Sequence, residues 1–81
     1  MTKKTENDVL REIEQTLELD SGSITLNALA ENVEGWDSMG HLSILLALDK
    51  MFEGKVAGIS EIAEANSISK LLEGLKKHSL I

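Results

Sequence analysis

The chain contains no cysteine and no apolar run long enough to cross a membrane. Without cysteine it has no disulfide, no thiolate metal site and no thiol nucleophile of its own, so any thiol chemistry must be imported. Residues 1–6 lead into acidic sequence rather than into the apolar core of a secretion signal, so we expect a cytoplasmic protein that does not insert into membranes. The 81 residues predict a single domain over residues 1–81, too small to enclose a large catalytic cavity.

Basic residues are also scarce. Eight Lys and Arg stand against fourteen Asp and Glu, which gives a net charge of −6 at pH 7. This charge opposes contact with nucleic acid phosphates and anionic lipid and favours basic protein partners, although it also serves ordinary solubility. The segment from Asp20 to Asp37 holds four acidic residues and no basic one, so the approach to Ser38 is acidic.

Apolar residues recur at helical spacing near the N-terminus. We expect a first helix over about residues 6–19, opened by a capping box at residues 5–8, with Glu12, Glu14 and Glu18 on its outer side. A long loop follows, and long loops in compact domains tend to be functional. The side chains expected to anchor this loop to the core are Ile24, Leu26, Leu29, Val33 and Trp36.

The run over residues 39–54 predicts a buried second helix with Ser38 in its first turn. Projection at ~100° per residue turns one broad arc toward the bundle and leaves Met39 and Leu46 on a flank with Ser43 and Lys50. The residues of the inward arc are Leu42, Ile44, Leu45, Leu48 and Phe52.

Two further helices complete the prediction. After a stop at residues 53–55, the segment around residues 59–63 predicts one or two short turns. Asn66 or Ser67 can cap a fourth helix that ends in the cations of residues 76–78. Its apolar stripe is Ile68, Leu71, Leu72 and Leu75. The expected fold class is therefore all-α, a four-helix bundle with a long loop between the first two helices, a short third helix and no strands.

Ser38 lies where the loop meets the second helix. The first N–H groups of a helix lack internal partners and the helix dipole is positive there, so an anionic group on Ser38 would be stabilised by about 0.3–1 kcal/mol. A phosphodiester suits this position. Asp37 or Ser38 can also be present only to cap the helix, and the local sequence leaves both interpretations open.

The run Asp37-Ser38-Met39, followed by Leu42, Ile44, Leu45, Leu48 and Phe52, resembles the acyl carrier proteins, whose Asp-Ser-Leu motif carries 4′-phosphopantetheine on the serine. Phe52 lies fourteen positions after Ser38, as the phenylalanine that closes this helix does in that family, while Met39 replaces the usual leucine. The resemblance covers nearly the whole chain. It implies a bundle of acyl-carrier type and a Ser38 modified from coenzyme A by a phosphopantetheinyl transferase with Mg²⁺. Cargo would ride as a thioester on a chain that is not itself an enzyme.

The resemblance also implies partners that load and transfer acyl groups through basic docking patches, acting on a monomer. The residues expected to contact them are Asp37, Met39, Leu46 and Asp49. Met39 and Leu46 have the alternative of covering core edges.

Three positions of the second helix differ from the acyl carrier pattern, and the differences bear on which cargo the chain carries. Gly40, Ser43 and Lys50 replace residues that are usually acidic in fatty acid carriers. We therefore expect a specialised pathway, such as lipopolysaccharide, surface polysaccharide, modified lipid or polyketide biosynthesis, rather than housekeeping fatty acid synthesis. The sequence Asp-Ser-Met-Gly also resembles D-alanyl carrier proteins, which leaves an aminoacyl cargo as an alternative.

Two neighbours of Ser38 have more than one interpretation. His41 lies one turn further on, where it can touch the phosphate of an attached arm, titrate near neutral pH or simply be exposed. Gly40 costs about 1 kcal/mol relative to alanine inside a helix, which predicts a close approach to its backbone by the arm or an enzyme loop, or a frayed first turn.

Two other function classes remain as rivals. Asp37, Ser38 and His41 can be interpreted as an acyl-transfer constellation, since side chains three apart on a helix can meet. The chain can also be interpreted as a noncovalent interaction module that binds through the acidic loop and the Met39–Leu46 flank. The module predicts unchanged partner affinity in a Ser38→Ala variant.

Overall fold

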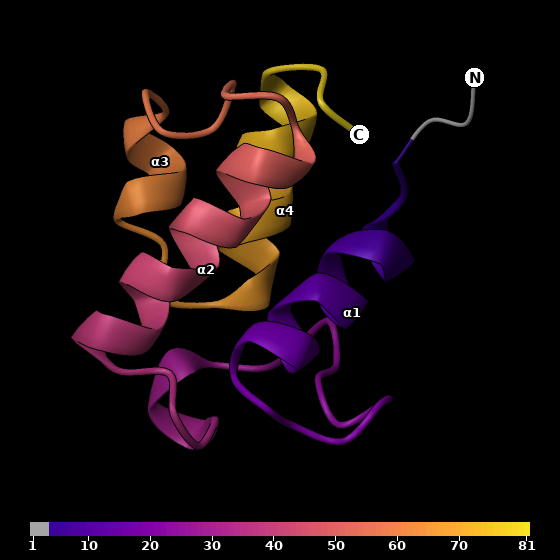
Figure 1. Ribbon diagram of the computed structural model, residues 1–81, viewed down its shortest axis with the longest axis vertical. Coiled ribbons are helices and arrows are strands. Elements are labelled where there is room, and N and C mark those ends of the chain that lie inside the picture. Colours follow the sequence, from indigo (N-terminus) through magenta and orange to yellow (C-terminus); the bar gives the residue numbers. More distant parts are fainter. Residues whose placement is uncertain (1–3) are drawn as a thin grey trace.

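Four helices make up the computed structural model, which describes residues 4–81 (Figure 1). They are α1 (Glu6–Thr16), α2 (Ser38–Met51), α3 (Ser60–Ala63) and α4 (Ile68–Lys77), and a 3-10 helix, η1 (Ala30–Asn32), lies in the loop between α1 and α2. Residues 4–81 form no strand, only an isolated bridge between Leu29 and Ser67. The predicted all-α class and the number of helices are confirmed. No helix within this range combines the length and apolarity needed to span a bilayer.

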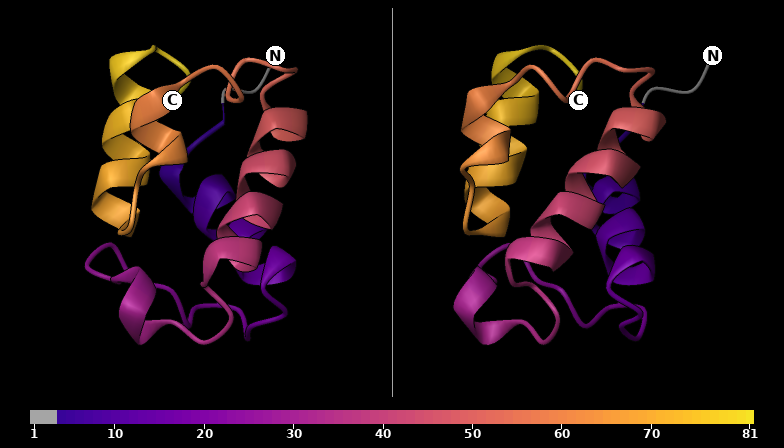
Figure 2. Two further views of the ribbon diagram at one scale, coloured as in Figure 1. Left: turned by 90° about the vertical axis from the view of Figure 1, so that its left-hand side faces the viewer. Right: turned by 60° about the vertical axis from the view of Figure 1, so that its left-hand side comes forward.

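The central helix of the arrangement is α2. It lies between α1 and α3, and α3 lies alongside α4 (Figures 1 and 2). The loop that carries η1 passes beneath the start of α2, so it delivers the chain to Ser38 at one end of the bundle (Figure 2). Side chains from all four helices and from the loop fill one core.

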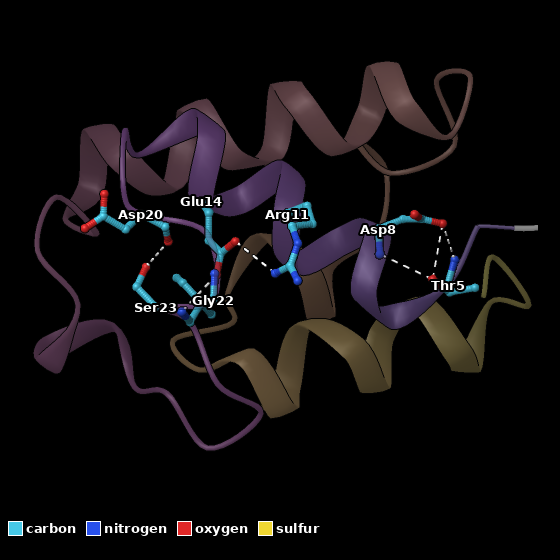
Figure 3. Close-up of polar contacts among 8 residues, drawn as sticks. Thr5, Asp8, Arg11, Glu14, Asp20, Gly22 and Ser23 are labelled. Atoms are coloured by element: carbon cyan, nitrogen blue, oxygen red, sulfur yellow. Dashed lines mark hydrogen bonds and ion pairs between the residues drawn. The ribbon is translucent and has the colours of Figure 1, made fainter.

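The predicted capping box opens α1. The Thr5 hydroxyl accepts the Asp8 N–H at 3.3 Å, and Asp8 Oδ2 accepts the Thr5 N–H at 2.9 Å (Figure 3). The helix ends at Thr16, earlier than expected. It ends there because Glu18 has a left-handed backbone (φ 59°), which lets the Leu19 N–H turn back to the Glu14 carbonyl.

Glu14 was expected on the outer side of the first helix, and this prediction is wrong because its side chain is only 2% exposed. Its Oε2 accepts the N–H groups of Gly22 and Ile24 at 2.9 and 3.0 Å, and Oε1 pairs with Arg11 Nη1 at 3.2 Å (Figure 3). Burial raises the pKa of Glu14, but the Ile24 and Gly22 N–H groups and Arg11 together hold it below its ordinary value. The carboxylate therefore fastens the start of the loop to α1.

The loop is held by its backbone as well as by its side chains. Ile24 and Trp36 are buried and Val33 packs against the core, as expected. Leu26 and Leu29 are exposed, so the prediction that they anchor the loop is wrong. Backbone hydrogen bonds hold this part of the loop instead: the Ala30 N–H donates to the Asn66 carbonyl at 2.8 Å, and the Ile68 N–H donates to the Ala28 carbonyl at 3.0 Å.

The second helix buries a narrower arc than predicted. Ile44, Leu48 and Phe52 are buried and Leu45 is partly buried, but Leu42 is 52% exposed, so its assignment to the core is wrong. Apolar residues occur around most of α2, and periodicity alone could not identify the side that α1 and α3 cover. The predicted stop after this helix is confirmed by the left-handed backbone of residues 53 and 54.

The last two helices agree with their predictions. The Ser67 hydroxyl caps α4 by accepting the Lys70 N–H at 3.2 Å, and the whole apolar stripe of α4 is buried. Lys77 on α4 pairs with Glu61 on α3 at 2.9 Å, and this hydrogen bond is the main reason that the pKa of Glu61 falls to about 2. The ion pair of Lys77 with Glu61 joins the short α3 to α4.

Candidate functional site

Ser38 is the first residue of α2, and its side chain is exposed. The N-cap is Asp37, whose Oδ1 accepts the Gly40 N–H at 2.8 Å. Asp37, and not Ser38, therefore caps the helix. The Ser38 hydroxyl is free of that task and stands at the positive end of the helix dipole.

A shallow depression of about 490 Å³ opens beside Ser38. Three segments form it: the end of the loop with the first turn of α2, residue 30 of η1, and residues 63–66, which include the last residue of α3 and the three that follow it. We call it the Ser38 depression, and it is lined by Ala30, Trp36, Asp37, Ser38, His41, Ala63, Glu64, Ala65 and Asn66. A larger depression of about 710 Å³ lies between α3 and α4 and does not include Ser38.

Trp36 forms the buried floor of the site and is only 5% exposed, which confirms that it packs the end of the loop. Its indole Nε1–H donates to His41 Nδ1 at 3.0 Å, and the two rings lie edge to edge, with centroids 6.1 Å apart and planes 18° from parallel. The other ring nitrogen, His41 Nε2, lies 3.1 Å from the carbonyl oxygens of both Ile62 and Ala63. His41 is therefore half-buried and bonded, and the expectation of a merely exposed histidine is wrong.

Another group approaches the backbone of Gly40 closely, as the presence of glycine in a helix predicted. The approaching group belongs to this chain and not to an attached arm or an enzyme. A Cβ on residue 40 would collide with the Gly35 carbonyl oxygen and would lie 3.2 Å from Leu17 Cδ2. Gly35 in turn has φ 85°, a backbone conformation that glycine adopts without strain. The first turn of α2 is packed against the loop at this point and is not frayed.

The acyl-transfer constellation does not form a relay in this geometry. Asp37 Oδ1 is engaged by the Gly40 N–H, and both nitrogens of His41 are engaged by Trp36 and by α3 carbonyls. A general base must reach the proton that it removes, and His41 is instead turned to these partners. Within residues 4–81 no group of three or more His, Asp or Glu side chains is placed to hold a metal ion.

The residues expected to contact partners fall into two groups. Met39 and Leu46 are 75% and 65% exposed, so neither covers a core edge, and the exposed Leu42 joins them. We call this surface the α2 outer face, and it consists of Met39, Leu42, Ser43, Leu46 and Lys50.

Asp49 belongs to the other group, because its carboxylate is used inside the fold. Its Oδ1 accepts the N–H groups of Val56 and Ala57 at 3.0 and 2.8 Å. Asp49 is half-buried and ties the end of α2 to the segment that leads into α3. The α2 outer face consequently has no acidic residue of its own.

Sequence reasoning missed the bridge from Trp36 through His41 to α3. One signal for it was present: a buried tryptophan needs a partner for its indole N–H, and a histidine follows five residues later. The carbonyls of α3 come from a distant part of the sequence, so no local pattern indicated them.

No family model, curated protein or solved structure matched the chain in our comparisons.

Proposed function

We propose that this chain is a carrier domain whose Ser38 is modified by 4′-phosphopantetheine and carries acyl groups as thioesters. The observation that carries the proposal is the position of Ser38. It is exposed at the first residue of α2, relieved of capping by Asp37, and open to the Ser38 depression. The resemblance of the Asp37-Ser38-Met39 run to acyl carrier proteins supports the same function.

The residues around Ser38 fit such a group. A phosphodiester on Ser38 would meet the N-terminus of α2, where helix N–H groups and the helix dipole favour negative charge. The depression offers apolar surface from Trp36, Ala63 and Ala65 and an amide from Asn66. The bound group would supply the thiol that the sequence lacks.

The chain itself would hold the acyl cargo and present it to partner enzymes, because tethering raises the effective concentration of the cargo at each of them. Exposed acidic residues lie on the loop, at Glu31, Glu34 and Asp37, and not on the α2 outer face. We propose that basic patches of partners meet this acidic loop while apolar partner surface meets Met39, Leu42 and Leu46. This distribution favours a specialised pathway over housekeeping fatty acid synthesis.

A second candidate is a noncovalent interaction module, which the exposed apolar side chains of the α2 outer face favour. The two candidates differ in their dependence on Ser38. A carrier loses its function in a Ser38→Ala variant, whereas a module keeps its partner affinity.

The deciding experiment incubates the chain with coenzyme A, Mg²⁺ and a broad-specificity phosphopantetheinyl transferase and records intact masses. We expect the wild type to gain one phosphopantetheine and Ser38→Ala to gain none. Ser60→Ala is the matched control, since Ser60 is also an exposed serine at the first residue of a helix, α3, and it should be modified like the wild type.

A folded wild type that gains no mass, or equal gain in Ser38→Ala, would contradict the proposal, and circular dichroism verifies the fold of each variant. Loading of the modified chain with acyl and aminoacyl donors then distinguishes the acyl cargo from the D-alanyl alternative.

A further inference from the structure

The partners of His41 fix which ring nitrogen carries the hydrogen. An indole N–H can only donate, so His41 Nδ1, 3.0 Å from Trp36 Nε1, must be an acceptor. A carbonyl oxygen can only accept, so His41 Nε2, 3.1 Å from the oxygens of Ile62 and Ala63, must carry the hydrogen. The bonded ring is therefore the neutral Nε2–H tautomer, oriented from both sides.

We propose that His41 is a positioning residue that clasps the start of α2 and ties it to α3, and thereby fixes Ser38 relative to the opposite wall of the Ser38 depression. The bond between Trp36 and His41 spans Ser38 in the chain, because Trp36 precedes the serine and His41 follows it. The bonds to Ile62 and Ala63 then join this closed turn to the end of α3. One imidazole thus connects two of the three segments that line the depression, the first turn of α2 with the loop before it and the end of α3.

The segment that contains α3 is also tied to the C-terminal end of α2, so loss of the His41 bonds would affect only the end of α3 near Ser38. Asp49 Oδ1 accepts the N–H groups of Val56 and Ala57, so α2 holds the segment of residues 56–63 at both of its ends. Helix α3 has only four residues, and so short a helix depends on tertiary contacts. Loss of the His41 tie would release the end of α3 that faces Ser38 and leave the Asp49 tie in place.

Two variants separate the hydrogen bonds of His41 from its bulk. His41→Phe keeps an aromatic ring beside Trp36 but removes both nitrogens. His41→Gln keeps one donor and one acceptor on a side chain of similar reach. A role that rests on ring packing alone is preserved by phenylalanine, and a role that rests on the bonds is rescued by glutamine.

The first measurement needs no modification of Ser38. Long-range ¹⁵N–¹H spectra of the wild type should show a hydrogen on His41 Nε2 and none on Nδ1, and the opposite tautomer overturns the proposal. This readout stays decisive even if a variant does not fold, because it uses the wild type.

In His41→Phe, hydrogen exchange of the Trp36 indole and of the backbone N–H groups of residues 63–65 should accelerate about tenfold, as expected for one lost hydrogen bond. Exchange in α1 should stay unchanged. Equal exchange at Trp36 and residues 63–65 in His41→Phe and wild type overturns the clasp.

The third measurement rests on the proposed function. For phosphopantetheine transfer to Ser38, His41→Phe should lower kcat about tenfold and leave KM unchanged, because the bonds position the serine while the α2 outer face is untouched. His41→Gln should recover part of kcat. Equal kcat in all three proteins overturns the positioning role. An unmodified wild type overturns the proposed function instead, and the exchange experiment then still decides whether the clasp exists.

Discussion

The carbonyl oxygen of Gly35 occupies the space in which a side chain on Gly40 would have to stand. The contact joins the last turn of the loop to the first turn of α2. Leu17, which follows α1, also lies near this point, since its Cδ2 is 3.2 Å from the position that a Cβ on residue 40 would take. Two glycines thus let three segments meet immediately beside Ser38. The cost of glycine in a helix is offset here by packing.

We expect Gly40→Ala to lower the free energy of unfolding by about 1–3 kcal/mol, the usual effect of overpacking, although alanine is the better helix former. Urea unfolding followed by circular dichroism measures the loss. Gly58→Ala is the control, since a Cβ there meets nothing within 4 Å, and it should stay within about 0.5 kcal/mol of the wild type. Equal stability of Gly40→Ala and wild type would contradict the close contact.

Glu14 makes stability depend on pH. Its pKa in the folded chain lies below the ordinary value of 4.5, so its contribution is fully present above pH 4.5 and is lost as the pH falls through the folded value. Glu14→Gln cannot ionise and places an amide near the N–H groups of Gly22 and Ile24. We expect it to cost about 1–3 kcal/mol at neutral pH and to flatten the loss of stability below pH 4.5.

Urea unfolding at a series of pH values tests this expectation. Glu12→Gln, a change of the same kind at a half-buried position of α1, should keep the wild-type pH dependence. An acid response of Glu14→Gln that matches the wild type would show that Glu14 does not fasten the loop.

Local sequence signals predicted the elements of this fold well. The capping box at Thr5, the stop after Phe52 and the stripe of α4 depend on residues close together in the chain, and the structure has all three. The position of Ser38 in the first turn of α2 was predicted for the same reason.

The errors have a common physical cause, because each depends on contacts between distant segments. Glu14 is buried since the returning loop presents N–H donors to it, and Leu42 is exposed since no other element covers that side of α2. His41 meets carbonyls that lie more than twenty residues away. Composition and periodicity contain none of these relationships.

Leu42 and Leu48 provide a direct test of which side of α2 is buried. Leu48 is fully buried, so Leu48→Ala should cost about 2–5 kcal/mol. Leu42→Ala removes the same atoms from a side chain that is 52% exposed, and it should cost less than about 1 kcal/mol. Urea unfolding of the two variants compares them directly, and similar losses would place Leu42 in the core after all.

The acidic loop tests where charged partners bind. If a basic patch of the phosphopantetheinyl transferase meets Glu31 and Glu34, the double variant Glu31→Gln/Glu34→Gln should raise the KM for the chain about threefold at low salt, and added salt should remove the difference. The double variant Glu12→Gln/Glu73→Gln changes the net charge equally at other sites and should leave KM near that of the wild type.

Asp49→Asn should also leave KM unchanged, because the Asp49 carboxylate accepts the N–H groups of Val56 and Ala57 inside the fold. If KM rises for Asp49→Asn alone, the transferase recognises a charge on α2 and not the acidic loop.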